Sequence, residues 1–395
     1  MSGRSDVKML GGGNPAHIPA VQTVWRRRMA EIMEDGDAFE RMLTNYDTPQ
    51  GDARFIEAFA AMLKRNFGWE VGPSNVAIMN GGQTAFFCML NMLSGAAADG
   101  GAPRRILLPL MPEYIGYADQ CVSRDAFIGL RPRVEFGSGH EFKYHIDFER
   151  LNLTDDVGAV VVSRPTNPTG NVLTAEELAR LAECARRKNV PVVVDKSYGL
   201  PFPGIMFGAE QFHWTPDMVF TFSLSKLGLP GTRTGIVVAS EEIVQGLVCM
   251  NSVLSLANGN LGQVLVRPLI ENDEILRLSR DVVQPFYVTK SRQALAWVDE
   301  FFDDDLDYHV HRSEGALFLW FWFRGLPVTD VTLYERLKQR GVIVVPGSYF
   351  FFGLEEPWSQ QHECIRVSYA QSDDAVRDGL RIIAEEVRTA YREDV

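Results

Sequence analysis

Between about residues 75 and 240, short apolar runs rich in β-branched residues alternate with stretches of helical periodicity. The runs are apolar throughout, which is typical of strands buried on both faces of a parallel sheet. Because parallel strands are joined by right-handed helical crossovers, this order predicts a doubly wound α/β domain. The predicted strands are Arg105–Leu110, Gly158–Ser163, Pro191–Asp195, Met218–Ser223 and Gly235–Ala239.

The clearest helix of this region is predicted over Ala175–Asn189. Thr174 and Glu177 have the spacing of a capping box, in which each side chain satisfies a backbone N–H at the start of a helix. Leu173 and Leu178 stand where a hydrophobic staple would pack. These signals predict that the helix begins directly after Thr174.

The last third of the chain has a different order of elements. Glu274–Phe302 has helical periodicity, and Pro285 predicts a kink or break within it. Strands mixed with helices predict a smaller α+β domain, onto which the N-terminal segment is expected to pack. We therefore expect an N-terminal segment over residues 1–40, a large α/β domain over 41–275 and a small α+β domain over 276–395. The remaining predicted strands are His309–His311, Ala316–Phe323, Val342–Val345 and Ile365–Tyr369, and the remaining helices are Val331–Arg340 and Asp373–Tyr391.

Charge and composition argue against several classes of protein. With 39 Lys and Arg against 51 Asp and Glu, the net charge of −12 gives no general attraction to nucleic-acid phosphates. The densest apolar run, Gly315–Phe323, is far shorter than the roughly 20 residues of a membrane-spanning helix. The first eight residues hold no apolar stretch typical of a signal peptide. The five cysteines are widely spaced and contain no CxxC pair, so we expect reduced thiols, a cytoplasmic location, and no nucleic-acid or membrane partner.

Lys226 follows the predicted strand Met218–Ser223 and stands among small and apolar residues. On its own, such a lysine is either a surface residue of a loop or an amine kept neutral by desolvation and ready to form an imine. Two serines before it, and glycines and Arg233 after it, add hydrogen-bond donors suited to a phosphate. The combination favours the second alternative and suits pyridoxal phosphate, which carries both an aldehyde and a phosphate.

Asp195 ends an apolar run, so it is expected at the carboxyl edge of the sheet, where α/β folds bind ligands. It either caps a following helix or supplies an anion to a cationic ring nitrogen, and this motif alone leaves both readings open. The ring of pyridoxal phosphate needs such a partner to stay protonated and act as an electron sink.

Three other features carry weaker signals. Asn80–Thr84 contains two glycines and precedes a predicted helix at Ala85–Leu93, and backbone N–H groups at a helix start attract anions. Glycines in that position more often form an ordinary turn. Asn167 lies in a loop that two prolines make rigid, and it either forms a turn or faces a ligand. His309 and His311 share one face of a predicted strand, but no further residues have the spacing of metal ligands, so no metal site is expected.

The order of these motifs resembles that of the class I and II aminotransferases of fold type I, which use pyridoxal phosphate. The matching pattern is an Asn-Pro-Thr-Gly loop, a strand ending in Asp with Tyr three residues later, Ser-x-Ser-Lys followed by an arginine, and a late arginine. The resemblance implies a mostly parallel, doubly wound large domain with a smaller α+β domain. Longer stretches resemble the valine–pyruvate branch of the family, and these are Met9–Ala16, Asn45–Asp47, Glu113–Asp119, Ser163–Asn171, Tyr198–Gly204 and Ser223–Gly231.

The resemblance implies a role at the cofactor for each matching residue. Lys226 corresponds to the lysine that forms a Schiff base with pyridoxal phosphate, and Asp195 to the partner of the ring nitrogen. Tyr198 and Asn167 correspond to the donors that bind the phenolic oxygen of the ring. Tyr114 corresponds to the aromatic residue that stacks on the ring.

The resemblance also implies how the phosphate is held and that the enzyme is a homodimer. Tyr46 corresponds to a tyrosine that reaches the phosphate in the neighbouring subunit, so two chains would share their active sites. The phosphate contacts within one chain are assigned to Gly82, Gln83, Ser223 and Arg233, the first two through backbone N–H groups.

Lys196 departs from the family pattern. A neutral or acidic residue is expected directly after the aspartate, and an inward-pointing lysine there would compete for Asp195. We expect Lys196 to point away, because neighbours on an extended segment alternate faces.

The resemblance assigns the substrate α-carboxylate to Arg366, assisted by Gly13 and Asn167. Because Arg233 and Arg366 already have anionic partners and residues 250–260 contain no basic residue, a second carboxylate on the substrate is not expected. The implied reaction moves an amino group between a small neutral amino acid, such as valine or alanine, and a 2-oxo acid, such as pyruvate or 3-methyl-2-oxobutanoate, by a ping-pong Schiff-base mechanism. The alternatives are a lyase that uses the same residues without an oxo acid, and a non-catalytic regulatory domain that binds pyridoxal phosphate.

Overall fold

Five of the seven strands of the larger sheet are apolar runs that the sequence predicts as strands, whereas Val76–Met79 and Phe127–Gly129 were not predicted. The computed structural model describes residues 7–96, 100–208, 213–302 and 306–393, so most of the stretch considered for a signal peptide lies outside the described residues. Seven strands lie in the order β2-β10-β9-β8-β7-β3-β4; β10 is antiparallel to both neighbours, and the other pairs are parallel. The strands are β2 Val76–Met79, β3 Arg105–Leu108, β4 Phe127–Gly129, β7 Val157–Ser163, β8 Val192–Asp195, β9 Met218–Ser223 and β10 Gly235–Val238.

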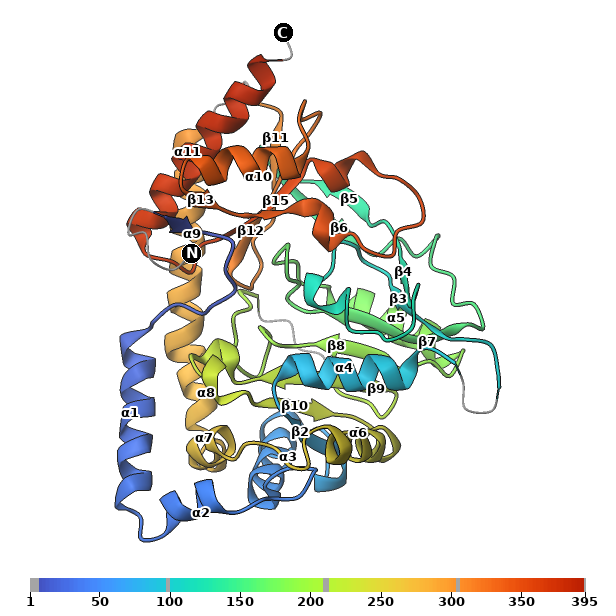
Figure 1. The fold of residues 1–395 in the computed structure, drawn as a ribbon, viewed down its shortest axis with the longest axis vertical. Coiled ribbons are helices and arrows are strands. Elements are labelled where there is room, and N and C mark those ends of the chain that lie inside the picture. Colours follow the sequence, from blue (N-terminus) through green and yellow to red (C-terminus); the bar gives the residue numbers. More distant parts are fainter. Residues whose placement is uncertain (1–6, 97–99, 209–212, 303–305, 394–395) are drawn as a thin grey trace.

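Helices connect these strands and cover the sheet (Figure 1). Helix α4, Gly82–Leu93, packs against β9 and β10, and α6, Glu241–Leu254, packs against β2 and α4. Helix α3, Ala53–Phe67, packs against β2 and against α7, Leu261–Glu271. The central strands β7, β8 and β9 are buried along their whole length, which confirms the prediction of a doubly wound α/β architecture.

Helix α5 begins where the capping box predicts. It spans Ala175–Arg186; the hydroxyl of Thr174 accepts a hydrogen bond from the backbone N–H of Glu177, and the Glu177 carboxylate accepts one from the backbone N–H of Thr174. The helix ends three residues before the predicted Asn189, because the chain turns there and Asn189 itself has a φ of 55°. The capping signal therefore located the start of α5 better than the apolar periodicity located its end.

A second sheet has six strands in the order β14-β15-β12-β11-β6-β5. Strands β5 and β6 come from residues 133–145, a segment that the sequence places in the larger domain and does not predict as strands. They join this sheet because β6 pairs with β11. The strands are β5 Arg133–Phe136, β6 Glu141–His145, β11 Tyr308–His311, β12 Phe318–Phe323, β14 Val345–Pro346 and β15 Cys364–Ser368, and the helices α10 Asp330–Gln339 and α11 Asp373–Arg392 follow the prediction closely.

The long helical stretch before this sheet is interrupted next to its proline. Helix α8, Glu274–Leu278, passes through a π-helical turn at Ser279–Val283 into α9, Gln284–Phe301. Pro285 has no backbone N–H to donate and stands in the first turn of α9, where that donor is not needed. The predicted break is therefore a change of helical winding directly before Pro285.

The N-terminal segment is divided between the two parts of the molecule. Strand β1, Lys8–Met9, pairs with β13, Val342–Ile343, beside the smaller sheet. Helix α1, Pro19–Glu34, instead packs on α7 of the larger part, and Trp25 donates its indole N–H to the carbonyl of Leu227 (Figure 1). Helix α1 thus contacts α7, within the range predicted for the large domain, and the π-helical turn Ser279–Val283, within the range predicted for the small one, so the predicted division of the chain stays a prediction. Helix α2, Ala38–Thr44, follows.

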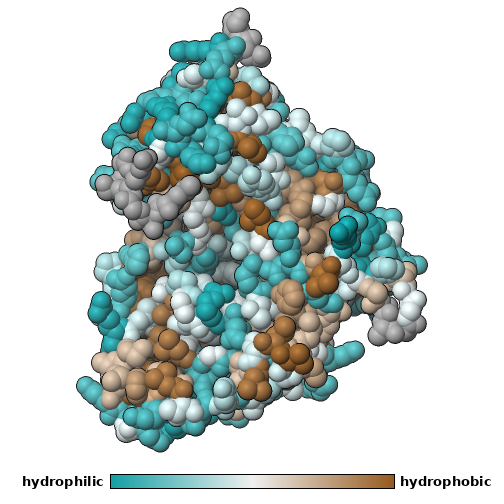
Figure 2. Space-filling view, viewed as in Figure 1, coloured by the Kyte–Doolittle hydropathy of each residue, from teal (hydrophilic) through white to brown (hydrophobic). Residues whose placement is uncertain are grey.

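The surface carries polar side chains over most of the face in Figure 2, with apolar groups gathered over its lower part, where α1, α2 and α6 lie. The larger exposed apolar side chains of this region include Leu43, Tyr46, Val253, Leu254 and Leu256. Within the described part of the chain, no helix combines the length and apolar character needed to cross a bilayer.

Candidate active site

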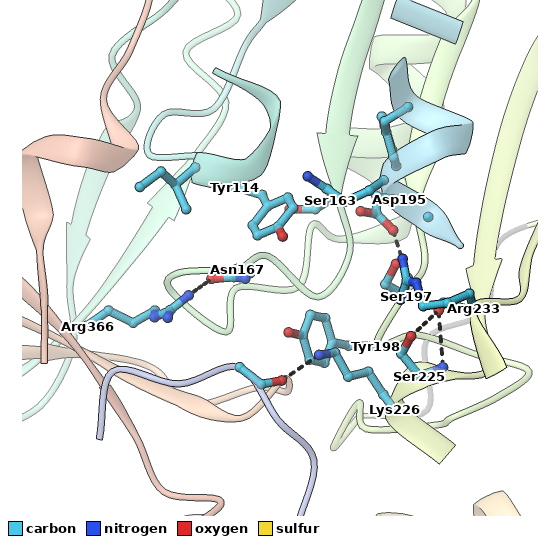
Figure 3. A pocket seen from close by; sticks show the side chains of 16 residues that line it. Tyr114, Ser163, Asn167, Asp195, Ser197, Tyr198, Ser225, Lys226, Arg233 and Arg366 are labelled. Carbon is cyan, nitrogen blue, oxygen red and sulfur yellow. Dashed lines mark hydrogen bonds between the residues drawn. The ribbon is translucent and has the colours of Figure 1, made fainter. Parts of the chain in front are cut away.

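One cavity collects nearly all of the residues that the sequence assigns to a site. It opens where β7, β8 and β9 end, and β15 of the smaller sheet and the N-terminal segment complete its wall. In Figure 3, Arg366 lies at one end of this space and Arg233 at the other, with Tyr114 and Asp195 on one side and Tyr198 and Lys226 opposite. The predicted residues that line it are Gly13, Gly82, Gln83, Tyr114, Asn167, Asp195, Tyr198, Ser223, Lys226, Arg233 and Arg366.

Lys226 lies in a single 3₁₀ turn directly after β9, and its ammonium donates a hydrogen bond to the carbonyl of Gly13 over 2.5 Å. Burial and the positive charge of Arg366 lower the pKa of the Lys226 amine to about 8, while Asp195 opposes the shift. Roughly a tenth of this amine is therefore neutral at pH 7, far more than for an ordinary lysine, and the neutral amine is the form that attacks carbonyl carbon or accepts a proton.

Asp195 ends β8 and is held by three hydrogen bonds. One carboxylate oxygen accepts from the backbone N–H of Ser197 over 2.8 Å and from the hydroxyl of Thr221 over 3.1 Å, and the other accepts from the phenol of Tyr117 over 2.6 Å. Asp195 is only 8% exposed. A carboxylate held in this way is fixed in position and can face a cation in the cavity.

Tyr117 is a site residue that sequence reasoning missed. It lies three residues after Tyr114, in the short turn Ile115–Tyr117, and the two rings pack edge to face with centroids 5.2 Å apart. Burial raises the pKa of Tyr117 well above its ordinary value, so its phenol remains a donor to Asp195. The spacing of the two tyrosines is visible in the sequence, but nothing there relates Tyr117 to Asp195.

An anion cradle lies at the far end of the cavity. Gly81 has a φ of 87°, and a Cβ at this position would lie 2.2 Å from Nη2 of Arg233, so only glycine fits between the guanidinium and the start of α4. The hydroxyls of Ser223 and Ser225 lie 3.0 Å apart on the same side. Among the described residues, no carboxylate forms an ion pair with Arg233. Its guanidinium donates a 3.4 Å hydrogen bond to the carbonyl of Pro230. Helix N–H groups, two hydroxyls and a guanidinium without a carboxylate partner among these residues together suit a phosphate.

A second cation site lies at the opposite end. Arg366 is only 5% exposed and lies in β15 between the rings of Phe318 and Phe350, 4.0 and 5.2 Å from its guanidinium carbon. It donates to the side-chain oxygen of Asn167 over 2.6 Å and to the carbonyl of Gly11 over 2.7 Å, while its buried Nε has no hydrogen-bond partner among the described atoms. Burial lowers its pKa to about 10, so the guanidinium remains charged at neutral pH. A buried cation with only neutral partners is suited to bind a carboxylate.

Two aromatic residues complete the walls. The amine of Lys226 lies 5.3 Å from the ring centroid of Tyr198. Burial raises the pKa of Tyr198, and the nearby Arg366 opposes this shift, so the phenol remains a hydrogen-bond donor. Tyr114 is half-buried at the other side, with its ring in the cavity (Figure 3).

Two further predicted residues lie outside the cavity. Tyr46 is 83% exposed and does not meet the other site residues within one chain. Lys196 is buried with its ammonium 4.6 Å from the ring centroid of Phe220, and the ion pairs of the described residues include none between Lys196 and Asp195. Lys196 therefore points away from Asp195, as expected. His309 and His311 belong to no group of three metal-ligating side chains in the described part of the chain.

Known proteins share this architecture over almost the whole chain. A family model for aminotransferase class I and II matches residues 21–383. The valine–pyruvate aminotransferase of Escherichia coli K12 is 44% identical over 385 residues, covering 98% of this chain and 92% of that protein. The solved valine–pyruvate aminotransferase of Salmonella typhimurium LT2 has a TM-score of 0.91 at 43% identity, covering 98% of this chain and 97% of that one. A solved protein of Psychrobacter arcticum 273-4 has a TM-score of 0.96 at 40% identity, covering 99% and 93%.

These matches explain why one cavity contains a buried amine, an acceptor for a cationic ring and two separate anion sites. Enzymes of this family use pyridoxal phosphate, and the cradle around Arg233 and the carboxylate of Asp195 fit its phosphate and its ring nitrogen. From the family match over residues 21–383 and the 44% identity over nearly the full length, the chain belongs to the class I and II aminotransferases.

Proposed function

We propose that this protein binds pyridoxal phosphate in the cavity and moves an amino group from a small neutral amino acid, such as valine or alanine, to a 2-oxo acid, such as pyruvate or 3-methyl-2-oxobutanoate. The observation that carries this proposal is the pair of separate anion sites, one around Arg233 and one at Arg366, with the amine of Lys226 between them (Figure 3). Two relatives at 43–44% identity are valine–pyruvate aminotransferases, which supports the choice of substrates, whereas relatives at about 20–25% identity include aspartate aminotransferases.

The residues present fit the cofactor in each of its parts. Its phosphate would be held by the backbone N–H groups of Gly82 and Gln83, the hydroxyl of Ser223 and the guanidinium of Arg233. Asp195 would face the ring nitrogen, Tyr114 would stack on the ring, and Tyr198 and Asn167 would bind the phenolic oxygen. Bound there, pyridoxal phosphate supplies an electrophilic carbon for the exchange of amines and a ring that withdraws electrons from it.

Lys226 has two tasks in this proposal. Its amine would hold the cofactor, and its Nζ would then be free to move the proton of the substrate α-carbon. Both tasks need a neutral amine, and the pKa of about 8 supports that role. Asp195 would hold the charge on the ring nitrogen, and its carboxylate accepts hydrogen bonds from Tyr117 and Thr221 that fix its position.

Arg366 would orient the substrate. Its guanidinium has an unpaired Nε and could exchange the carbonyl of Gly11 and the amide of Asn167 for a carboxylate. This fork would direct the α-carbon of the amino acid towards Lys226. Gly13, whose carbonyl holds the Lys226 ammonium, would border the same carboxylate.

The preference for neutral substrates follows from the charges of the cavity. The cationic side chains that line it are Lys226, Arg233 and Arg366, and each already has a role. A substrate with a second carboxylate would bury that charge without a partner, at a cost of several kcal/mol. Since one methylene group changes binding by only about 1–3 kcal/mol, the choice of valine over leucine or alanine rests on the likeness to the relatives.

We also propose a homodimer with shared active sites in the cytoplasm. Tyr46 is 83% and Val253 is 85% exposed, and a surface region that gathers several exposed apolar side chains is typical of a protein–protein contact. A second copy would cover them and would bring the phenol of Tyr46 towards the neighbouring cavity. The five cysteines are free thiols, which supports a reducing compartment.

A panel of amino acids decides the proposed function. Pure protein with pyridoxal phosphate would be incubated with valine, alanine, leucine or aspartate and a matched oxo acid, and kcat/KM would be measured for each. We expect valine and alanine to be the best donors and the reaction to require an oxo acid. Release of ammonia without an oxo acid would indicate a lyase, and aspartate as the best donor would overturn the neutral pocket.

A further inference from the structure

A second buried carboxyl group lies beside the cavity, and the reaction proposed above does not use it. Glu113 is 0% exposed and directly precedes Tyr114. One of its carboxylate oxygens accepts the backbone N–H of Tyr114 over 2.9 Å and the hydroxyl of Ser163 over 2.8 Å. The other accepts the backbone N–H of Ser163 over 2.7 Å.

These three hydrogen-bond donors explain how a carboxyl group can be fully buried at this position. Among the described residues, no cation forms an ion pair with Glu113, so hydrogen bonds alone compensate its lost hydration. Burial raises the pKa of Glu113 to about 8, and the bonds from Tyr114 and Ser163 oppose that shift. An apolar residue at this position would avoid the desolvation but would leave two backbone N–H groups and a hydroxyl without an acceptor.

The bonds of Glu113 join parts of the site that are far apart in the sequence. Its side chain ties Tyr114 to Ser163, which ends β7 beside Asp195 and lines the cavity. Its backbone N–H donates to the carbonyl of Phe350 over 3.0 Å, and the ring of Phe350 lies 5.2 Å from the guanidinium of Arg366. The residue thus connects the aromatic wall, the end of a central strand and the segment beside the second cation site.

We propose that Glu113 is a positioning residue that sets the place of the Tyr114 ring in the cavity, and through that ring the affinity and orientation of the cofactor. It acts on the backbone of Tyr114 and touches no reacting atom. This inference rests on the proposed binding of pyridoxal phosphate, because Tyr114 is the side chain expected to stack on the cofactor ring. Removing the carboxylate would release the backbone N–H of Tyr114 and allow the ring to tilt.

The test is the dissociation constant of pyridoxal phosphate and the visible circular dichroism of the bound cofactor, both measured on the full-length protein freed of cofactor and titrated with it. Glu113→Gln keeps the shape of the side chain but places an NH₂ group against one of the donors. We expect its affinity to fall at least about tenfold, since an NH₂ group in place of one carboxyl oxygen leaves a buried donor without an acceptor, and the dichroism per bound cofactor to change. Glu177→Gln is the control, because Glu177 is a partly buried carboxylate that, like Glu113, accepts backbone N–H bonds, but at the start of α5.

A double-mutant cycle separates positioning from a general loss of structure. In the background of Tyr114→Ala, the effect of Glu113→Gln on affinity should largely disappear, because the ring through which Glu113 acts is gone. An equal loss in both backgrounds, or unchanged affinity and dichroism in Glu113→Gln alone, would overturn the inference. If Glu113→Gln does not fold, Ser163→Ala removes one of the three donors and carries the same cycle. If the wild-type protein fails to bind pyridoxal phosphate, the proposed function is refuted. If the wild type binds the cofactor and transaminates, and Glu113→Gln has the same affinity and dichroism, only this inference is refuted.

Discussion

Replacing Asp195 by asparagine tests the proposed electron sink most directly. The asparagine keeps the shape of the side chain and one acceptor oxygen, but it removes the charge that would face the ring nitrogen. Removing one partner of a buried charge pair costs roughly 3–5 kcal/mol, which corresponds to a fall of about 150- to 5,000-fold in kcat/KM. The structure supports a value in this range, because Asp195 is only 8% exposed and solvent can replace little of the lost interaction.

The same substitution also disturbs the three hydrogen bonds to Asp195, so stability must be measured beside activity. The donors are the phenol of Tyr117, the hydroxyl of Thr221 and the backbone N–H of Ser197. Asp195→Ala would leave all three without an acceptor at about 1–3 kcal/mol each, whereas Asp195→Asn retains an acceptor for at least one of them. Urea unfolding of both variants separates this structural cost from the catalytic one.

The assay compares kcat/KM of Asp195→Asn and Tyr117→Phe with that of the wild type, using valine and pyruvate with saturating pyridoxal phosphate. Tyr117→Phe removes one donor to the carboxylate but keeps its charge. Its rate should therefore fall less than that of Asp195→Asn, by no more than about 10- to 150-fold, as expected for a hydrogen bond of about 1.5–3 kcal/mol to a charged group. A rate for Asp195→Asn within tenfold of the wild type, in a variant that unfolds as cooperatively as the wild type, would refute the assignment of Asp195 to the ring nitrogen.

Three further predictions concern other parts of the molecule. Lys226→Ala should abolish turnover and still bind pyridoxal phosphate without a covalent bond, since the phosphate cradle is formed by other residues. Near-normal transamination by this variant would show that another amine is catalytic. Mixing Tyr46→Phe with Lys226→Ala protein should change activity relative to the two separate proteins, because hybrid dimers would contain one cavity with both native residues; sedimentation at the assay concentration that finds an active monomer would contradict the shared site. Burial lowers the pKa of His311 to about 3, below its ordinary 6.5, so the unfolded chain binds a proton that the folded chain does not as the pH falls below about 6.5. The free energy of unfolding should therefore decrease from pH 6.5 towards pH 3, and His311→Gln should weaken that dependence in urea titrations; an unchanged slope would mean that other groups cause it.

The larger sheet was predictable because its signals are local. A strand buried on both faces must be apolar at every position, so Val157–Ser163, Val192–Asp195 and Met218–Ser223 are visible as runs in the sequence itself. The start of α5 was equally visible, because a capping box is formed by residues three positions apart. Strands β5 and β6 escaped prediction because their pattern is polar and mixed; β5 pairs with β6, and β6 joins the sheet by pairing with β11.

The residue types of the site could also be identified from the sequence, but the sequence did not show that they lie in one cavity. The motifs around Lys226, Asp195 and Arg366 indicate the chemistry, and the resemblance to a family assigns a role to each residue. The contacts are long-range: Gly11 and Arg366 are 355 positions apart, and Gly13 and Lys226 are 213 apart. No local pattern determines such distances, so the bond from Tyr117 to Asp195 and the bonds from Glu113 to Ser163 were found only in the fold.

The N-terminal segment shows the difference between what the sequence indicates and what only the tertiary structure shows. The sequence contains Val21, Trp25 and Ile32 at the helical spacing of an apolar face, although no helix was predicted there, and three glycines at residues 11–13. It does not say which surface that face will cover. Burial is a property of two surfaces at once, and only the tertiary structure shows that α1 lies against α7 while Gly11 and Gly13 offer their carbonyls to Arg366 and Lys226. The sequence by itself thus determined the elements and the chemical groups, and the long-range packing decided which of those groups share a cavity.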